Sequence, residues 1–144
     1  MQTNPNSYFS FDELKVFFKH TTYHGFVHPY NFLEWTSYVR EAFFAQHCPD
    51  FEAILISPIK MMTTKISADY LGESKFGDRL QARFTSTKIK KVSFDVIVRF
   101  MNTQSAQKIC QTYHSLVFVD SLTGKFTSIP QSIKEAVSKY QEPD

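Results

Sequence analysis

Apolar side chains recur at steps of three and four along one stretch of the chain. They are Phe32, Trp35, Val39, Ala42 and Phe43. This spacing places them along one side of an α-helix that begins near Pro29 and ends between Gln46 and Pro49. Gly25, just before it, can adopt backbone angles that other residues avoid, and the fixed φ of Pro29 suits a first helical turn. The pattern predicts a turn that leads into a long helix with an aromatic face.

Alternating apolar and polar positions predict strands on both sides of this helix. Before it, residues Leu14 to His20 form a short predicted strand. After it, apolar side chains of one parity between Phe51 and Tyr70 predict one long strand bent at Pro58, or two strands meeting there. Further strands are expected around residues 80–85, 92–100 and 109–120, with a loop at 71–78 and short connections at 88–91 and 102–106.

The chain is expected to end in a hairpin and a helix. Residues 121–124, Ser-Leu-Thr-Gly, predict a hairpin turn into a short strand over residues 125–129. Pro130 then opens a terminal helix. The apolar stripe of that helix consists of Ile133, Ala136, Val137 and Tyr140.

The order of these elements predicts an α+β fold. A strand and a long helix are followed by four or five antiparallel strands, and a curved antiparallel sheet wrapped around the helix buries both apolar surfaces at once. The 144 residues suit a single domain over residues 1–144, with residues 1–7 frayed. Such a sheet leaves an open edge, so we expect two subunits to pair edge to edge.

Composition and charge exclude several classes of protein. Lys and Arg total 16 against 14 acidic residues, and the longest basic run is Lys90-Lys91, which argues against a nucleic-acid-binding protein. No apolar run approaches the roughly 20 residues that span a bilayer. Cys48 and Cys110 have no CxxC partner and the N-terminus has no secretory pattern, so we expect reduced thiols and a cytoplasmic protein.

Polar and aromatic side chains gather at the predicted start of the long helix. Unpaired backbone N–H groups and the helix dipole favour negative charge there. His24 and His28 flank the turn, and either can supply a base because imidazole is the side chain suited to proton transfer at neutral pH. Their spacing suits a metal ion only on a regular helix, which Gly25 and Pro29 interrupt. We therefore expect no metal and no cofactor.

One block in this region reads Gly25-x-Val27-x-x-x-Asn31-Phe32-Leu33-x-Trp35, with Arg40-Glu41 downstream. It resembles the G-x-V-x-x-x-N-Y-L-R-W…R-E block of hotdog-fold acyl thioesterases of the 4-hydroxybenzoyl-CoA thioesterase type. Within that superfamily the likeness is greatest to the small thioesterases of enediyne polyketide biosynthesis. Their helix exit and C-terminal segment are similar to His47-Cys48-Pro49 and to residues 128–133. The resemblance covers roughly residues 12–140.

This resemblance implies a homodimer or homotetramer with acyl-thioester sites at subunit interfaces, near the start of the central helix. Many relatives have a catalytic Asp three residues before the glycine, and the enediyne group has Asn; this chain has Thr22. Thr22 can position a water molecule but is not a general base. Phe32 stands where the enediyne group commonly has a functional tyrosine. Pro29 has no N–H to donate where relatives supply an oxyanion-hole amide.

Arg40 matches the arginine that the enediyne group uses in catalysis. Its planar guanidinium can hold a thioester carbonyl, a β-keto acid carboxylate or the charge of a tetrahedral intermediate. The alternative role for Arg40 is an ion pair with Glu34 or with Glu41 of the partner subunit.

These observations predict an enzyme, a thioesterase that hydrolyses an acyl or β-ketoacyl thioester carried on acyl carrier protein or coenzyme A, in polyketide or fatty-acid metabolism. Arg40 and the helix N-terminus would stabilise the oxyanion, while Thr22, with His24 or His28, orients the water. The expected substrate-binding residues are Tyr23, Tyr30, Asn31 and Phe32. Tyr23, Tyr30 and Asn31 can equally be helix-cap and packing residues.

Two other functions fit the same sequence. Thr22 and Pro29 favour a non-catalytic module that binds acyl thioesters on the same fold. A dehydratase of the same architecture would need a histidine and a carboxylate across the dimer interface, and the sequence does not place that carboxylate.

Overall fold

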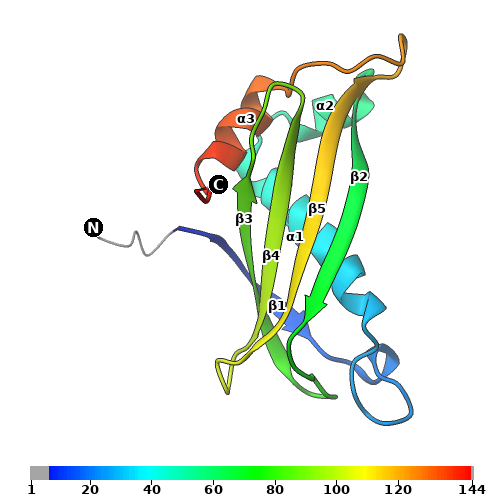
Figure 1. The fold of residues 1–144 in the computed structure, drawn as a ribbon, viewed down its shortest axis with the longest axis vertical. Coiled ribbons are helices and arrows are strands. Elements are labelled where there is room, and N and C mark those ends of the chain that lie inside the picture. Colours follow the sequence, from blue (N-terminus) through cyan, green and yellow to red (C-terminus); the bar gives the residue numbers. More distant parts are fainter. Residues whose placement is uncertain (1–6, 144) are drawn as a thin grey trace.

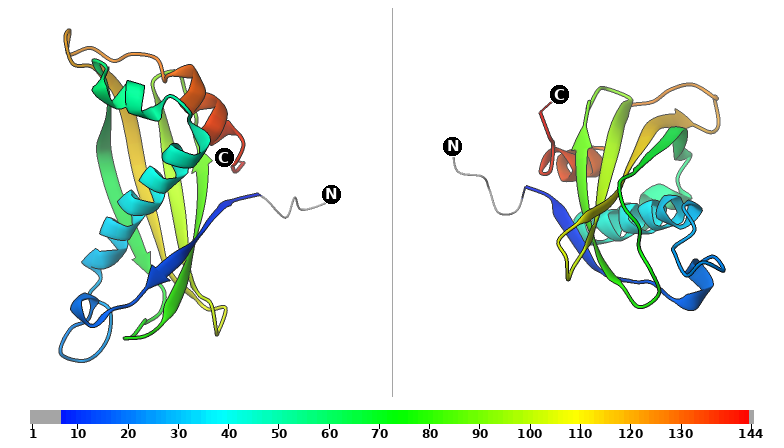
Figure 2. Two further views of the ribbon diagram at one scale, coloured as in Figure 1. Left: turned by 180° about the vertical axis from the view of Figure 1, so that it is seen from behind. Right: turned by 60° about the horizontal axis from the view of Figure 1, so that its bottom comes forward.

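One antiparallel sheet of five strands curves around a long helix in the computed structural model, which describes residues 7–143 (Figure 1). The helix, α1 (Tyr30–His47), crosses one face of the sheet diagonally (Figure 2). The strand order is β1-β3-β4-β5-β2. The bounds are β1 Phe9–Lys15, β2 Ile59–Tyr70, β3 Arg79–Thr87, β4 Ser93–Asn102 and β5 Lys108–Asp120. The α+β architecture is as predicted, and all of the predicted frayed segment except Ser7 lies outside the described residues.

The aromatic face of α1 packs on the inner face of the sheet. Phe43 is fully buried and stacks on Phe84 of β3, with ring centroids 4.1 Å apart. Nearer the start of the helix, the Phe32 ring meets the Phe100 ring of β4 at 5.3 Å. Burying a large apolar side chain stabilises the fold by about 1.5–3 kcal/mol. This row of rings therefore fixes where the polar groups of α1 lie over the sheet.

The first strand differs from its prediction. The chain forms β1 earlier than expected, and the second half of the predicted strand is a short 3₁₀ helix, η1 (Phe18–His20). β1 pairs with β3 from Phe9 opposite Phe84, and the register shifts between Phe11 and Leu14. This irregularity breaks the alternation of buried and exposed side chains, so the sequence pattern did not mark the strand.

The segment after α1 was predicted as a strand and is a helix, α2 (Phe51–Ile56). Its Phe51 ring stacks on Phe44 of α1 at 5.4 Å. Phe51 and Ile54 lie three residues apart, which suits one face of a helical turn, whereas Ile56 is 88% exposed. Pro58 therefore separates a helix from β2, which begins at Ile59, and is neither a bend in one strand nor a junction of two strands.

β2 forms one edge of the sheet, and its outer side pairs with no other strand within residues 7–143. Its pairing with β5 shifts between Thr63 and Lys65. Met61 lies opposite the buried Phe118 before the shift, and Ile66 lies opposite the buried His114 after it. The single parity predicted for this strand is therefore wrong, because the irregularity reverses it.

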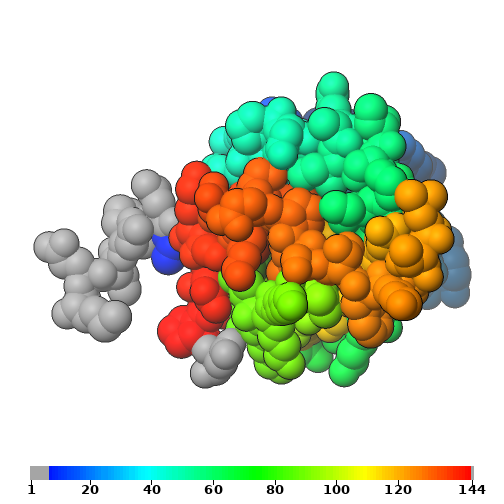
Figure 3. All heavy atoms as spheres, turned by 90° about the horizontal axis from the view of Figure 1, so that it is seen from above, coloured from blue at the N-terminus to red at the C-terminus, as the bar shows by residue number. Residues whose placement is uncertain are grey.

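One end of the molecule is closed by helices and a loop (Figure 3). The expected terminal helix is α3 (Gln131–Ser138), and its Ile133, Ala136 and Val137 are buried. The short strand predicted over residues 125–129 is reduced to one bridge, between Val119 and Phe126. No helix in residues 7–143 combines the length and apolarity that crossing a membrane requires.

The stacked ring of Phe43 provides a test of this packing. We expect Phe43→Ala to lower the free energy of unfolding by about 3–5 kcal/mol, because the cavity cannot fill between two rigid elements. Urea denaturation measures the loss. Leu122→Ala, at a loop side chain that is 80% exposed, is the matched control and should change stability little. Equal effects of the two substitutions would contradict the packing described.

Candidate active site

The turn before α1 carries three of the predicted site residues, Thr22, Tyr23 and His24. The Thr22 N–H donates to the Phe26 carbonyl at 2.8 Å, and the Gly25 N–H donates to the Thr22 carbonyl at 2.9 Å. Gly25 has φ +88°, which explains the glycine at this position. Tyr23 is 94% exposed, and its ring lies 4.0 Å from that of His24. Within one chain, both side chains therefore face away from the core.

His28 caps the start of the helix. Its Nδ1 accepts from the Tyr30 N–H at 3.4 Å, and its ring lies 4.2 Å from the Tyr30 ring. The first N–H groups of a helix have no partner within it, and Pro29 has none to offer. His28 and Tyr30 are both exposed at this end of α1.

Asn31 and Phe32 hold the entrance of α1 to the rest of the molecule. The buried Asn31 amide donates to the carbonyls of His20 and His28, at 2.8 and 3.1 Å. Phe32 is also buried, and its ring packs against Phe100. These contacts fix the turn against the helix, and the structure places both side chains in packing positions.

Arg40 lies about 15 Å beyond Tyr30 along the helix axis, because an α-helix rises by a fixed amount per residue. Its Nη1 is 3.0 Å from Nδ1 of His114 on β5, and it donates to Oγ1 of Thr63 on β2 at 3.4 Å. Burial lowers the pKa of the guanidinium, while Glu41 acts in the opposite direction. Arg40 is therefore a partly desolvated cation between helix and sheet. Within one chain, the structure does not bring it together with Thr22, His24 or His28.

His114 is the residue that the sequence analysis missed. It is 1% exposed, and burial followed by the nearby Arg40 charge lowers its pKa to about 4. Its Nε2 has no hydrogen-bond partner in the described part of the chain. The signal was in the strand pattern, because His114 is the one ionisable side chain at an inward position between Thr112 and Leu116.

A second polar pair lies two residues away on the same strand. The hydroxyls of Thr36 on α1 and Thr112 on β5 are 2.5 Å apart, and Thr36 also donates to the Phe32 carbonyl at 2.7 Å. Both threonines are buried. Two polar pairs, Thr36 with Thr112 and Arg40 with His114, therefore interrupt the apolar contact between α1 and β5.

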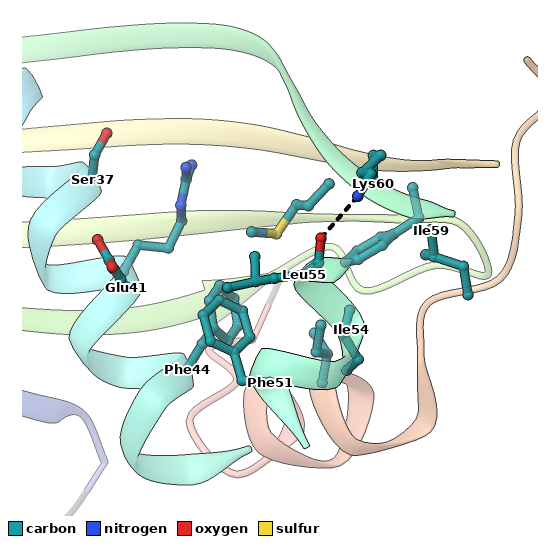
Figure 4. Close-up of a pocket in the computed structure, with 12 residues that line it drawn as sticks. Ser37, Glu41, Phe44, Phe51, Ile54, Leu55, Ile59 and Lys60 are labelled. Carbon is teal, nitrogen blue, oxygen red and sulfur yellow. Dashed lines mark hydrogen bonds between the residues drawn. The ribbon is translucent and has the colours of Figure 1, made fainter. Parts of the chain in front are cut away.

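Arg40 also lines a pocket of about 330 Å³ between α1, α2 and β2 (Figure 4). The polar lining residues are Ser37, Arg40, Glu41 and Lys60. The apolar ones are Phe44, Phe51, Ile54, Leu55, Ile59, Met61, Phe118 and Ile133. Lys60 donates to the Leu55 carbonyl at 2.8 Å and so ties β2 to α2. The pocket can hold an apolar chain, with a guanidinium at its polar side.

Several solved structures share this fold. The Synechocystis protein Slr0204, a 1,4-dihydroxy-2-naphthoyl-CoA thioesterase, is 20% identical with a TM-score of 0.84, and the match covers 91% of this chain and 96% of Slr0204. The dynemicin thioesterase, described with bound polyene, is 19% identical with a TM-score of 0.87, covering 95% and 99%. SAV2348 from Staphylococcus aureus, described in complex with CoA, is 14% identical with a TM-score of 0.83, and the match covers 92% of this chain and 83% of SAV2348. These likenesses confirm the predicted hotdog fold.

The sequence itself provides the family assignment. No curated protein was found to match the chain. Residues 16–137 match the family model described as the thioesterase-like superfamily, which spans the turn, α1, the whole of β2 to β5 and most of α3. The chain therefore belongs to the thioesterase-like superfamily.

Proposed function

We propose that this protein is a thioesterase that hydrolyses an acyl or β-ketoacyl thioester carried on coenzyme A or on an acyl carrier protein. The main support for this function is the position of Arg40, a partly buried cation on the wall of an apolar pocket. Burying a charge is costly, so an ionisable group that is partly buried in a pocket is a candidate for a functional role. Slr0204 is a thioesterase for a CoA thioester and SAV2348 binds CoA, and both likenesses support the same class of substrate here.

In this proposal the pocket binds the acyl chain and Arg40 stabilises the charge that develops during hydrolysis. Each methylene of an acyl chain that enters the pocket gains about 0.8 kcal/mol from burial. The thioester carbonyl then lies at the polar side of the pocket, beside the guanidinium. As water attacks the carbonyl carbon, the oxygen becomes an anion, and a preorganised cation stabilises that charge more strongly in a partly desolvated site than in water.

The attacking water needs a group that orients it. Thr22, with His24 or His28, remains the proposed set, and these residues lie on the turn at the start of α1. Glu41 also lines the pocket, so its carboxylate is a further group that can hold the water. Because the turn and Arg40 stand about 15 Å apart along one helix, the turn would have to come from a second protomer.

A homodimer formed through β2 would supply that turn. Ile66 and Tyr70, which lie on the same face of this edge strand, are each about half exposed, as expected for a surface that another subunit covers. A two-fold axis through the middle of β2 brings the Tyr70 end of one strand beside the Ile59 end of the other. The Tyr70 hydroxyl donates to the Pro29 carbonyl, which ties that end to the turn, whereas Ile59 lines the pocket. Pairing of two such dimers would give the homotetramer.

The metabolic setting is also part of the proposal. The likeness of residues 25–41 and 47–49 to enediyne thioesterases, and the polyene bound by the dynemicin thioesterase, support a carrier-bound chain in polyketide or fatty-acid metabolism. A second candidate is a module that binds acyl thioesters without cleaving them. Pro29, which has no N–H, and Thr22, which is no base, favour it.

Replacing Arg40 tests the proposed chemistry. We expect Arg40→Ala to lower kcat for thioester hydrolysis about a hundredfold or more, because the developing oxyanion loses its cation. Release of free thiol from a panel of acyl-CoA and acyl-carrier substrates measures it. Lys19→Ala, which removes an exposed cation, is the matched control and should retain full turnover. Unchanged turnover in Arg40→Ala would remove this residue from the mechanism, and tight binding without thiol release by the wild type would establish the non-catalytic module.

The proposed dimer has its own test. We expect sedimentation to give two or four times the mass of one chain, and amide hydrogen exchange to be slow along both sides of β2, because pairing protects the outward N–H groups. A monomer whose β2 amides exchange rapidly would contradict the proposed subunit pairing.

A further inference from the structure

We propose that His114 is a positioning residue, which holds the Arg40 guanidinium over the pocket so that its remaining N–H groups face the thioester carbonyl. This inference rests on the proposed function of Arg40. Two acceptors on adjacent strands, His114 Nδ1 and Thr63 Oγ1, lie within hydrogen-bond distance of the same atom, Arg40 Nη1.

The chemistry of Arg40 and His114 determines which of them donates the hydrogen bond. A guanidinium has N–H donors and no acceptor, so His114 Nδ1 must accept. The imidazole is therefore neutral and carries its hydrogen on Nε2. That Nε2–H group is buried without a partner among the described residues, and such a group costs about 1–3 kcal/mol. A purely structural core would be more stable with an apolar side chain here, so the histidine calls for a functional explanation.

A neutral acceptor has an advantage that a carboxylate lacks. Asp or Glu at this position would also hold Arg40, but its negative charge would neutralise the guanidinium before a substrate arrived. The imidazole fixes the orientation of the side chain and leaves its full positive charge available. Nη1 uses its two N–H groups on His114 and Thr63, whereas Nε and Nη2 have no protein partner in residues 7–143. The N–H groups of these two atoms are therefore available to bind a substrate oxygen.

The surroundings of His114 keep it neutral. Arg40 faces it from α1, Ile66 lies opposite it on β2, and Val96 lies opposite it on β4. Thr63 shares the contact with Arg40, and Glu41 acts on Arg40 from the exposed side of the helix. With its pKa lowered to about 4, the imidazole remains an acceptor at neutral pH. Acidification through that pKa would protonate it, remove the acceptor and place two cations side by side.

Two substitutions at His114 separate positioning from packing. We expect His114→Leu, which fills the space but accepts no hydrogen bond, to lower kcat about a hundredfold with little change in KM, since misplacing a catalytic group costs that much. His114→Asn keeps an acceptor near the position of Nδ1 and should restore most of the lost kcat. Equal losses in the two variants, or an unchanged kcat in His114→Leu, would overturn the proposal.

A second buried histidine provides the matched control. His47 also has a buried Nε2 without a partner among the described residues, but it packs against Phe43 and Tyr140, at the other end of α1 from the turn. His47→Leu should therefore leave kcat unchanged. A loss of kcat equal to that in His114→Leu would point to general disturbance of the fold and contradict a specific role for His114.

Nitrogen NMR of the imidazole tests the pair independently of turnover. In the wild type we expect a neutral ring with hydrogen on Nε2 down to about pH 5, and in Arg40→Gln a raised His114 pKa, because the neighbouring charge has gone. A ring with hydrogen on Nδ1, or one that titrates near pH 6.5, would refute the inference even in an active enzyme. Absence of thiol release despite the expected NMR result would instead refute the proposed hydrolysis.

Discussion

The site is organised around the Arg40 guanidinium, which is held by His114 and Thr63 where α1 packs on the sheet. Arg40 projects from a helix whose buried face is mainly aromatic and aliphatic, with Asn31 and Thr36 as its buried polar residues, and it is partly removed from water. The charge is tolerated because His114 and Thr63 accept its hydrogen bonds and because the pocket leaves one side open. The packing of α1 on β3 and β4 serves this site indirectly, since a shift of the helix by even part of a turn would separate Arg40 from both acceptors.

Irregular pairing in the edge strand contributes to the same site. The register of β2 against β5 shifts between Thr63 and Lys65, and the Thr64 hydroxyl there donates to the Ser115 carbonyl at 3.2 Å. The shift allows Thr63 to reach Arg40 while Ile66 still lies opposite His114. Such irregularities are common beside active sites because they redirect a side chain without ending the sheet.

The sequence predicted the parts of the molecule where one period dominates. The aromatic repeat of α1 and the alternation in β3, β4 and β5 were strong enough to define those elements, and Arg40 was identified through the resemblance to the enediyne thioesterases. Phe51–Ile56 was misassigned because six residues fit both periods. His114 could not be paired with Arg40 because 74 residues separate them, and only the packing of α1 on β5 brings them together.

A crystal structure with a bound substrate analogue would show whether Arg40 contacts the thioester carbonyl. The analogue would carry a methylene in place of the thioester sulfur, so that the enzyme binds it without cleaving it. We expect the acyl chain in the pocket lined by Phe44, Phe51 and Met61, with the carbonyl oxygen within hydrogen-bond distance of Nε or Nη2 of Arg40, and His114 still bound to Nη1. A carbonyl bound elsewhere, with no contact to that guanidinium, would contradict the role proposed for Arg40.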